Sequence, residues 1–118
     1  MRGRVSVSPA SAPPLHLCRW DWVPLGSSGL MVTAVFIPRA EMGYLKSIYE
    51  SWDGVAITRM AARADAAGEI LAAIVSTPDL MAEADAILSD YASRAGVAPK
   101  PAVLPPSCHE DWFLREWA

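Results

Sequence analysis

The stretch that decides the fold is MVTAVFIPRAEMGYLKSIYESWDG, residues 31–54. Residues 31–37 are apolar, rich in β-branched side chains and closed by Pro38, which predicts a buried strand. Between residues 39 and 52, apolar side chains recur at spacings of three and four, which predicts an amphipathic helix. Asp53-Gly54 ends this helix, because glycine accepts the left-handed conformation that helix ends often need. The apolar helix face comprises Met42, Leu45, Ile48, Tyr49 and Trp52.

Downstream, the sequence predicts a hairpin and a second helix. Residues 55–64 and 69–76 read as strands, and residues 65–68 between them form a four-residue turn that ends in Gly68. The second of these strands is apolar on both faces, which is typical of a central strand. Thr77-Pro78-Asp79 predicts a helix start capped by Thr77, and Gly96 predicts its end. The predicted buried stripe is Leu80, Ala84, Ile87, Leu88 and Tyr91, with Asp85 and Asp90 on a solvated outer face.

The order strand–helix–strand–strand–helix predicts an α+β fold of ferredoxin-like type. In this arrangement two helices cover one face of an antiparallel sheet, and residues 69–76 lie beside residues 31–37. A complete unit has a fourth strand after the second helix, and only Ala102-Val103-Leu104 offers one. Without that strand the first strand keeps an open edge, which predicts self-association or pairing with a partner protein.

The chain of 118 residues is long enough for one domain with flanking segments. Residues 1–30 contain four prolines and a Gly-Ser spacer, which predicts a disordered leader, and Met31 is an alternative translation start. Residues 31–96 form the predicted domain. Residues 97–118 form a proline-rich tail, whose Trp112, Phe113 and Trp117 we expect to fold back on the domain or to contact a partner.

Charge and composition exclude several classes of partner. Residues 31–96 carry five basic and nine acidic side chains, a net charge of −4, which excludes a nucleic-acid surface. The sequence has neither a polybasic patch nor an apolar run of about 20 residues, so we predict no membrane binding. Two distant cysteines do not make a disulfide framework. A cytoplasmic location is the expectation.

Residues 43–59, GYLKSIYESWDGVAITR, resemble the signature of a short bacterial family known as domain of unknown function 4911. The similar features are Tyr-Leu-Lys, a Glu-small-aromatic-Asp-Gly helix end and an apolar strand that contains Arg59. The resemblance extends more loosely over residues 31–93 and implies the same strand–helix–hairpin–helix unit. This chain departs from the family pattern in its two long tails and its alanine-rich hairpin. The family implies no activity.

Three cations and one carboxylate form the candidate ligand site. Arg59 and Arg63 share one side of a predicted strand, and together with Lys46 they suit a carboxylate or phosphate. Asp53 lies at the helix end, where it could present its carboxylate to a ligand. The favoured interpretation is structural: the arginines face water and pair with Glu69, and Asp53-Gly54 is a helix stop with Trp52 packed beneath it.

All histidines and cysteines of the chain lie in its flanking segments, as His16, Cys18, Cys108 and His109. Four such ligands suffice for a Cys₂His₂ zinc site that stitches the tails together. Their spacing is not that of a zinc finger, so isolated side chains are the favoured interpretation. A Cys18–Cys108 disulfide is a further alternative.

For catalysis, residues 31–96 offer no histidine, no cysteine, no hydroxyl with an evident base and no glycine-rich phosphate loop. We therefore predict no catalytic residue and no cofactor. The favoured function is a non-catalytic ligand-sensing or protein-interaction module. The alternatives are an enzyme or accessory subunit that holds a small anionic substrate on the sheet face, and a zinc-stitched structural protein.

Overall fold

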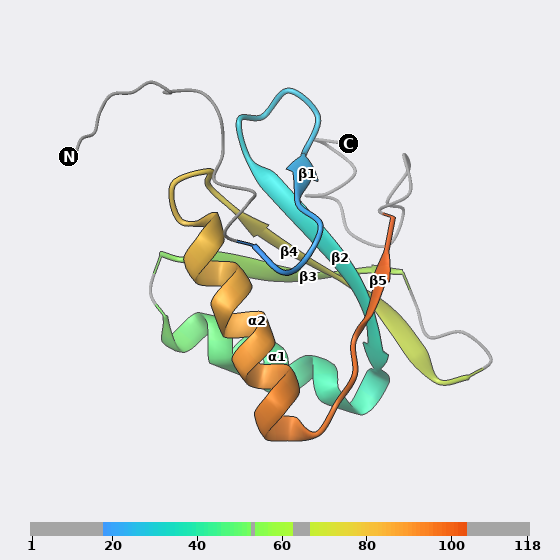
Figure 1. Cartoon of the computed structure of the whole chain (residues 1–118). Coiled ribbons are helices and arrows are strands. Elements are labelled where there is room, and N and C mark those ends of the chain that lie inside the picture. The colour runs from blue at the N-terminus through green and yellow to red at the C-terminus, as the bar shows by residue number, and fades with distance from the viewer. Residues whose placement is uncertain (1–17, 53, 63–66, 104–118) are drawn as a thin grey trace.

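The computed structural model describes residues 18–52, 54–62 and 67–103 (Figure 1). The chain has an α+β architecture, in which an antiparallel five-stranded sheet carries two helices. The elements in chain order are β1 (Val23–Pro24), β2 (Met31–Pro38), the short 3-10 helix η3 (Arg39–Glu41), α1 (Met42–Ser51), β3 (Ala56–Ala62), β4 (Glu69–Ser76), α2 (Met81–Ala95) and β5 (Lys100–Ala102).

The sheet has the strand order β1-β2-β4-β3, and β5 also pairs with β2. Strand β4 has the bounds that the sequence predicts and lies between β2 and β3, with Ala73 opposite both Ala34 and Arg59. Nearly all its side chains are buried, as expected for a central strand. A β-bulge between Met60 and Ala62 interrupts the pairing of β3 with β4.

The outer edge of β2 is shared by two short strands. Strand β1 pairs with residues 31–32, and β5 pairs with residues 34–36. The predicted last strand therefore forms at Lys100–Ala102, two residues earlier than expected, and Leu104 lies outside the described residues. Pro101 is tolerated there because an edge strand can spare one N–H group. Within the described part of the chain, the short strands β1 and β5 form one outer edge of the sheet, and the longer strand β3 forms the other.

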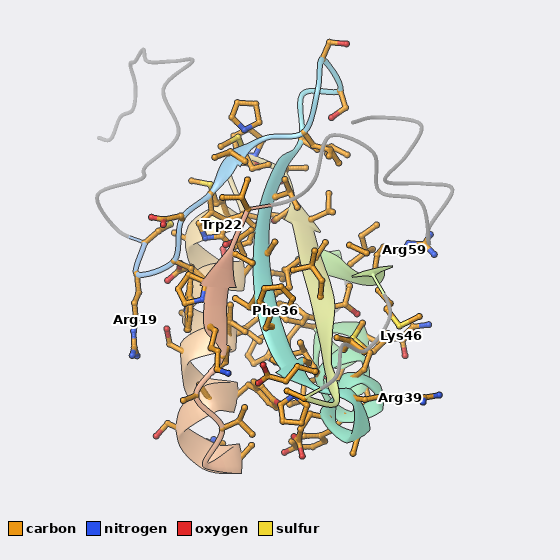
Figure 2. The ribbon with its side chains drawn as sticks, turned by 90° about the vertical axis from the view of Figure 1, so that its right-hand side faces the viewer. Arg19, Trp22, Phe36, Arg39, Lys46 and Arg59 are labelled. Atoms are coloured by element: carbon orange, nitrogen blue, oxygen red, sulfur yellow. The ribbon has the colours of Figure 1, made fainter. Side chains whose placement is uncertain are left out.

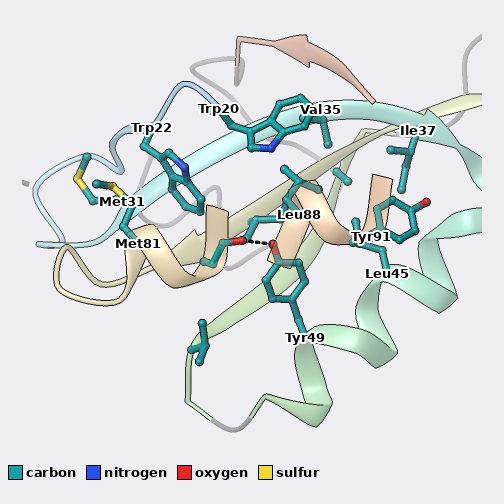
Figure 3. Packing of buried hydrophobic residues seen from close by; sticks show 14 of the residues in the cluster. Trp20, Trp22, Met31, Val35, Ile37, Leu45, Tyr49, Met81, Leu88 and Tyr91 are labelled. Carbon is teal, nitrogen blue, oxygen red and sulfur yellow. Dashed lines mark hydrogen bonds between the residues drawn. The ribbon is translucent and has the colours of Figure 1, made fainter. Parts of the chain in front are cut away.

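Both helices cover one face of the sheet, where the main core lies (Figures 1 and 3). Tyr49 on α1 reaches α2, where its hydroxyl donates a hydrogen bond of 2.6 Å to the carbonyl of Ala84. Full burial of a large aliphatic or aromatic side chain stabilises a fold by about 1.5–3 kcal/mol. The core between the layers includes Trp20, Trp22, Met31, Val35, Ile37, Leu45, Ile74, Met81, Leu88 and Tyr91.

Helix α2 begins at Met81, and its N-cap residue is Leu80, three residues later than the predicted cap at Thr77. Residues 77–80 form a turn instead, closed by the N–H of Leu80, which donates to the carbonyl of Thr77 at 3.1 Å. The threonine therefore contributes its backbone rather than its hydroxyl to the helix start. The predicted helix end is confirmed, because Gly96 is the C-cap residue and has φ of +66°.

Residues 18–30 belong to the folded domain, in contrast to the disordered leader expected for residues 1–30. The side chains of Trp20, Trp22 and Leu25 are buried, and Trp22 keeps only 4% of its surface exposed. Residues 1–17 lie outside the described residues. Composition alone suggested a leader because prolines and the Gly-Ser spacer dominate this stretch, whereas the surfaces that bury its tryptophans come from the distant α2 and β2.

Candidate functional site

A pocket of 220 Å³ opens between α1 and β3. Helix α1 contributes Lys46, Tyr49 and Glu50 to its lining, and β3 contributes residues 56–59, including Arg59. Figure 2 shows Lys46 and Arg59 on the same side of the molecule. The structure thus brings together two of the four predicted ligand residues from separate elements. The other two, Asp53 and Arg63, lie outside the described residues.

Local structure explains why these side chains meet at the pocket. Lys46 precedes the buried Tyr49 by three residues, so both lie on neighbouring parts of the α1 surface. On β3, Thr58 is buried, whereas Ile57 next to it is exposed on the opposite face. Because β3 is an edge strand, side chains from both of its faces, including Arg59, can line a pocket at that edge.

One of the lining residues, Thr58, has a buried hydroxyl group that makes no described hydrogen bond. No hydrogen-bond partner for Oγ1 of Thr58 exists among the residues that the structure describes. Leaving such a group unsatisfied in the interior costs about 1–3 kcal/mol. The neighbouring phenol of Tyr49 is already committed to the carbonyl of Ala84. Thr58 is one of the residues that line the pocket, although its Oγ1 atom has almost no accessible surface.

The charges around the pocket favour a small anion. Among the described lining residues, the ammonium of Lys46 and the guanidinium of Arg59 outnumber the carboxylates, because Glu50 is the one acidic side chain. The cavity holds the volume of about seven waters and is smaller than the roughly 300–1,000 Å³ typical of drug-sized ligands. Glu69, the predicted partner of the strand arginines, forms an ion pair of 3.0 Å with Lys100.

The turn after α1 differs from the expectation in one respect. Gly54 adopts the predicted left-handed conformation, with φ of +79°. Trp52, however, is 54% exposed, so the prediction that it packs beneath the turn is wrong. Helix α1 ends at Ser51, and the non-helical backbone of Trp52 takes its side chain off the buried face. The indole instead lines a groove of 300 Å³ between the helices, with Ile48, Glu83, Ala86, Ile87 and Asp90.

A buried polar cluster surrounds Asp85, and we did not predict it from the sequence. This carboxylate is 3% exposed, so its predicted place on a solvated face is wrong. Its Oδ1 accepts the backbone N–H of Arg19 at 2.8 Å. Its Oδ2 accepts the backbone N–H of Trp20 at 2.8 Å and the indole N–H of Trp22 at 2.9 Å. Asp85 therefore fastens residues 19–22 to α2 and is a structural carboxylate.

A signal for this cluster was present in the helical spacing. Asp85 follows the buried Met81 by four residues and precedes the buried Leu88 by three, so it shares their helix face. A carboxylate at such a position needs donors from elsewhere in the fold. Trp20 adds a further contact, because its indole N–H donates to the hydroxyl of Ser89 at 3.2 Å.

Of the four predicted metal ligands, only Cys18 lies within the described residues. Burial, and next the charge of Asp85, raises the pKa of the Cys18 thiol, which disfavours the thiolate that metals bind. Across residues 18–52, 54–62 and 67–103, no three histidine, cysteine or acidic side chains come together as a metal site. The remaining predicted ligands, His16, Cys108 and His109, lie outside these ranges.

Comparisons with known proteins assign no relative: no family model, curated protein or solved structure matches the chain. The resemblance of residues 43–59 to domain of unknown function 4911 therefore stays a prediction. Among the described residues, no helix has the length and apolar character needed to cross a membrane.

Proposed function

We propose that this protein is a non-catalytic ligand-sensing module that binds a small phosphate or carboxylate anion in the pocket between α1 and β3. The observation that carries the proposal is the convergence of Lys46, Arg59 and the hydroxyl of Thr58, which has no described partner, on one small cavity. Guanidinium and ammonium groups supply charge-assisted hydrogen bonds to such anions. In this proposal, anion binding recruits the unused hydroxyl of Thr58, another lining residue, as a neutral donor.

The roles of the nearby hydroxyl groups support binding rather than catalysis. The phenol of Tyr49 donates to the carbonyl of Ala84, and that of Tyr91 donates to the carboxylate of Glu41 at 2.9 Å. Thr58 also lines the pocket, and among the described lining residues the one candidate base for its hydroxyl is Glu50 on the facing helix. A binding role needs no such base.

A thermal-shift and calorimetry series on the full chain tests this function. The probes are inorganic phosphate, pyrophosphate and citrate. We expect at least one of them to raise the melting temperature, and Arg59→Ala and Lys46→Ala each to weaken its affinity tenfold or more. Arg39→Ala is the matched control, because Arg39 is an exposed cation on the same side of the molecule but outside the pocket lining (Figure 2).

Two outcomes contradict the proposal. One is the absence of any shift with all three probes at millimolar concentration and low ionic strength, where surface charges act most strongly. The other is an equal loss of affinity in Arg39→Ala and Arg59→Ala. That result would indicate nonspecific attraction to a positive side of the molecule instead of a built site.

We also propose self-association through the outer edge of β3. Support comes from the strand order, in which β3 is terminal, and from the exposed apolar side chains of Ile57 and Met60 on that strand. The edge of β2, which the sequence suggested, is occupied by β1 and β5. Light scattering over a hundredfold range of concentration tests the idea. We expect dimers that Met60→Lys dissociates, and a monomer at every concentration would contradict it.

The classification of the fold remains part of the proposal. The order β5-β2-β4-β3, with both helices on one face, supports the ferredoxin-like assignment. The same arrangement suits the proposed relationship to domain of unknown function 4911. A cytoplasmic location agrees with a pocket for a small metabolic anion, and fractionation of the native cells tests it.

A further inference from the structure

The face of the sheet opposite the helices is apolar. Directly opposed residues of neighbouring strands share a face, and three such pairs, Val32–Val75, Ala34–Ala73 and Phe36–Leu71, form rows across the centre. We call this surface the second face. The middle row consists of small alanines, and the outer rows carry larger side chains. Its buried members on the strands are Val32, Ala34, Ala61, Leu71, Ala73 and Val75.

The second face is buried although neither helix lies on it. Ala73 is 0% exposed, and Ala34 and Leu71 are also buried. Both helices pack on the other face (Figure 1). Among the described residues outside the sheet, Leu25 and Leu30, which flank the β1–β2 turn, are the apolar side chains that pack against this cluster. Two leucines are too few to cover three rows of side chains.

We propose that residues 104–118 of this same chain cover the second face as a third layer. Strand β5 delivers the chain there, because its last residue, Ala102, lies opposite Ala34 and packs against the second-face cluster. Fifteen residues can span up to about 50 Å, whereas four strands are only about 19 Å wide. The segment therefore has the length to cross the whole sheet.

The composition of the segment fits this surface. It contains Trp112, Phe113, Leu114 and Trp117, and each aromatic side chain can bury about 150–250 Å². Its charged side chains are three acidic and one basic. Two of the rows end in a cation: Lys100 lies opposite Phe36 at the β5 side, where it also pairs with Glu69, and Arg59 lies opposite Ala73 at the β3 side. Residues 1–17, the other long candidate, contain no aromatic side chain.

In this position, residues 104–118 would shield the apolar side chains of the second face from water. The proposal does not rest on the anion pocket, which lies between β3 and α1. It makes the C-terminal aromatic residues part of the fold, and their release would expose a surface suited to a second copy of the chain.

Cysteine labelling on the full chain tests the inference. In a Cys18→Ser, Cys108→Ser background, Ala34→Cys places a thiol on the second face, and its reaction with iodoacetamide is timed. We expect the thiol to be protected, and the combined changes Trp112→Ser, Phe113→Ser and Trp117→Ser to accelerate its labelling tenfold or more. Trp52→Ser, which removes an exposed tryptophan between the helices, is the matched control and should leave the rate unchanged.

A thiol in the main core distinguishes exposure of the second face from unfolding of the whole domain. Ala84→Cys lies between the helices and should stay protected in the same serine variants. If both thiols become reactive in the triple variant, single Trp112→Ser and Trp117→Ser chains give the same comparison in a folded protein. Labelling of Ala34→Cys that does not respond to any of these changes overturns the proposal. Protection that vanishes on dilution also overturns it, since a second copy would then be the cover.

Discussion

Removing the carboxylate of Asp85 should detach residues 18–25 from α2 and destabilise the domain. In Asp85→Ala, three N–H groups lose their acceptor, namely the backbone groups of Arg19 and Trp20 and the indole of Trp22. Each unsatisfied buried donor costs about 1–3 kcal/mol. We take the low end, because Arg19 is exposed and its N–H can turn to water, and because the burial of a charge is relieved at the same time.

The expected loss is therefore about 3 kcal/mol in the free energy of unfolding, roughly a hundredfold in the equilibrium constant. Urea denaturation followed by tryptophan fluorescence measures it. With a slope of about 2 kcal/mol per molar urea, the midpoint should fall by about 1.5 M. Asp85→Asn keeps one acceptor oxygen, and we expect about half of that loss.

Asp90 on the same helix provides the control. Its ion pair with Arg94 spans 2.9 Å, but the two side chains are 62% and 75% exposed. Exposed pairs of this kind contribute about 0–1 kcal/mol, so Asp90→Ala should leave the midpoint nearly unchanged. The reasoning is refuted if Asp85→Ala unfolds within about 0.5 kcal/mol of the wild type, a difference typical of surface substitutions, or if the two alanine variants behave alike.

Three further predictions concern the pocket and its surroundings. Burial, and next the charge of Asp85, raises the pKa of the Tyr49 phenol. Because the unfolded chain then loses the phenolic proton at a lower pH than the folded chain, the free energy of unfolding should hold below about pH 10 and fall above it. Denaturation curves should show a smaller fall for Tyr49→Phe. Thr58→Val should leave the melting temperature unchanged or raise it, since it removes an unsatisfied hydroxyl. Calorimetry should show that the same change weakens phosphate binding about fivefold or more. Unchanged affinity would exclude the hydroxyl from the site. Gly54→Ala should cost about 1 kcal/mol in chemical denaturation because φ is +79° there, whereas Gly43→Ala, inside helix α1 at an open position, should stabilise the chain.

Local patterns in the sequence were sufficient for the central elements of the fold. Strand β4 has its predicted bounds, because an apolar run between a glycine turn and Thr77-Pro78 leaves little freedom at either end. The apolar face of α1 also placed Leu45 and Tyr49 in the core. These features depend on residues within a few positions of one another.

Features that depend on distant partners could not be predicted in the same way. The N–H donors to Asp85 come from residues 63 to 66 positions away. Helical spacing could place Asp85 on the buried face of α2, but it could not identify these donors. The folded structure of residues 18–30 was not predicted either, because the surfaces that bury Trp20 and Trp22 belong to distant elements. The candidate site was partly predicted: the charges of Lys46 and Arg59 suggested an anion, but the contribution of Thr58 depends on burial that a sequence does not display.

The most direct test of the proposed anion site is a titration of the ¹⁵N-labelled full chain with inorganic phosphate, followed by backbone amide resonances. If phosphate binds this pocket, we predict saturable shifts confined to residues 46–50 of α1 and 56–59 of β3, the two segments that line the pocket. In Arg59→Ala these shifts should require at least tenfold more phosphate. Shifts that never saturate, or that centre on a part of the chain remote from α1 and β3, would contradict the account.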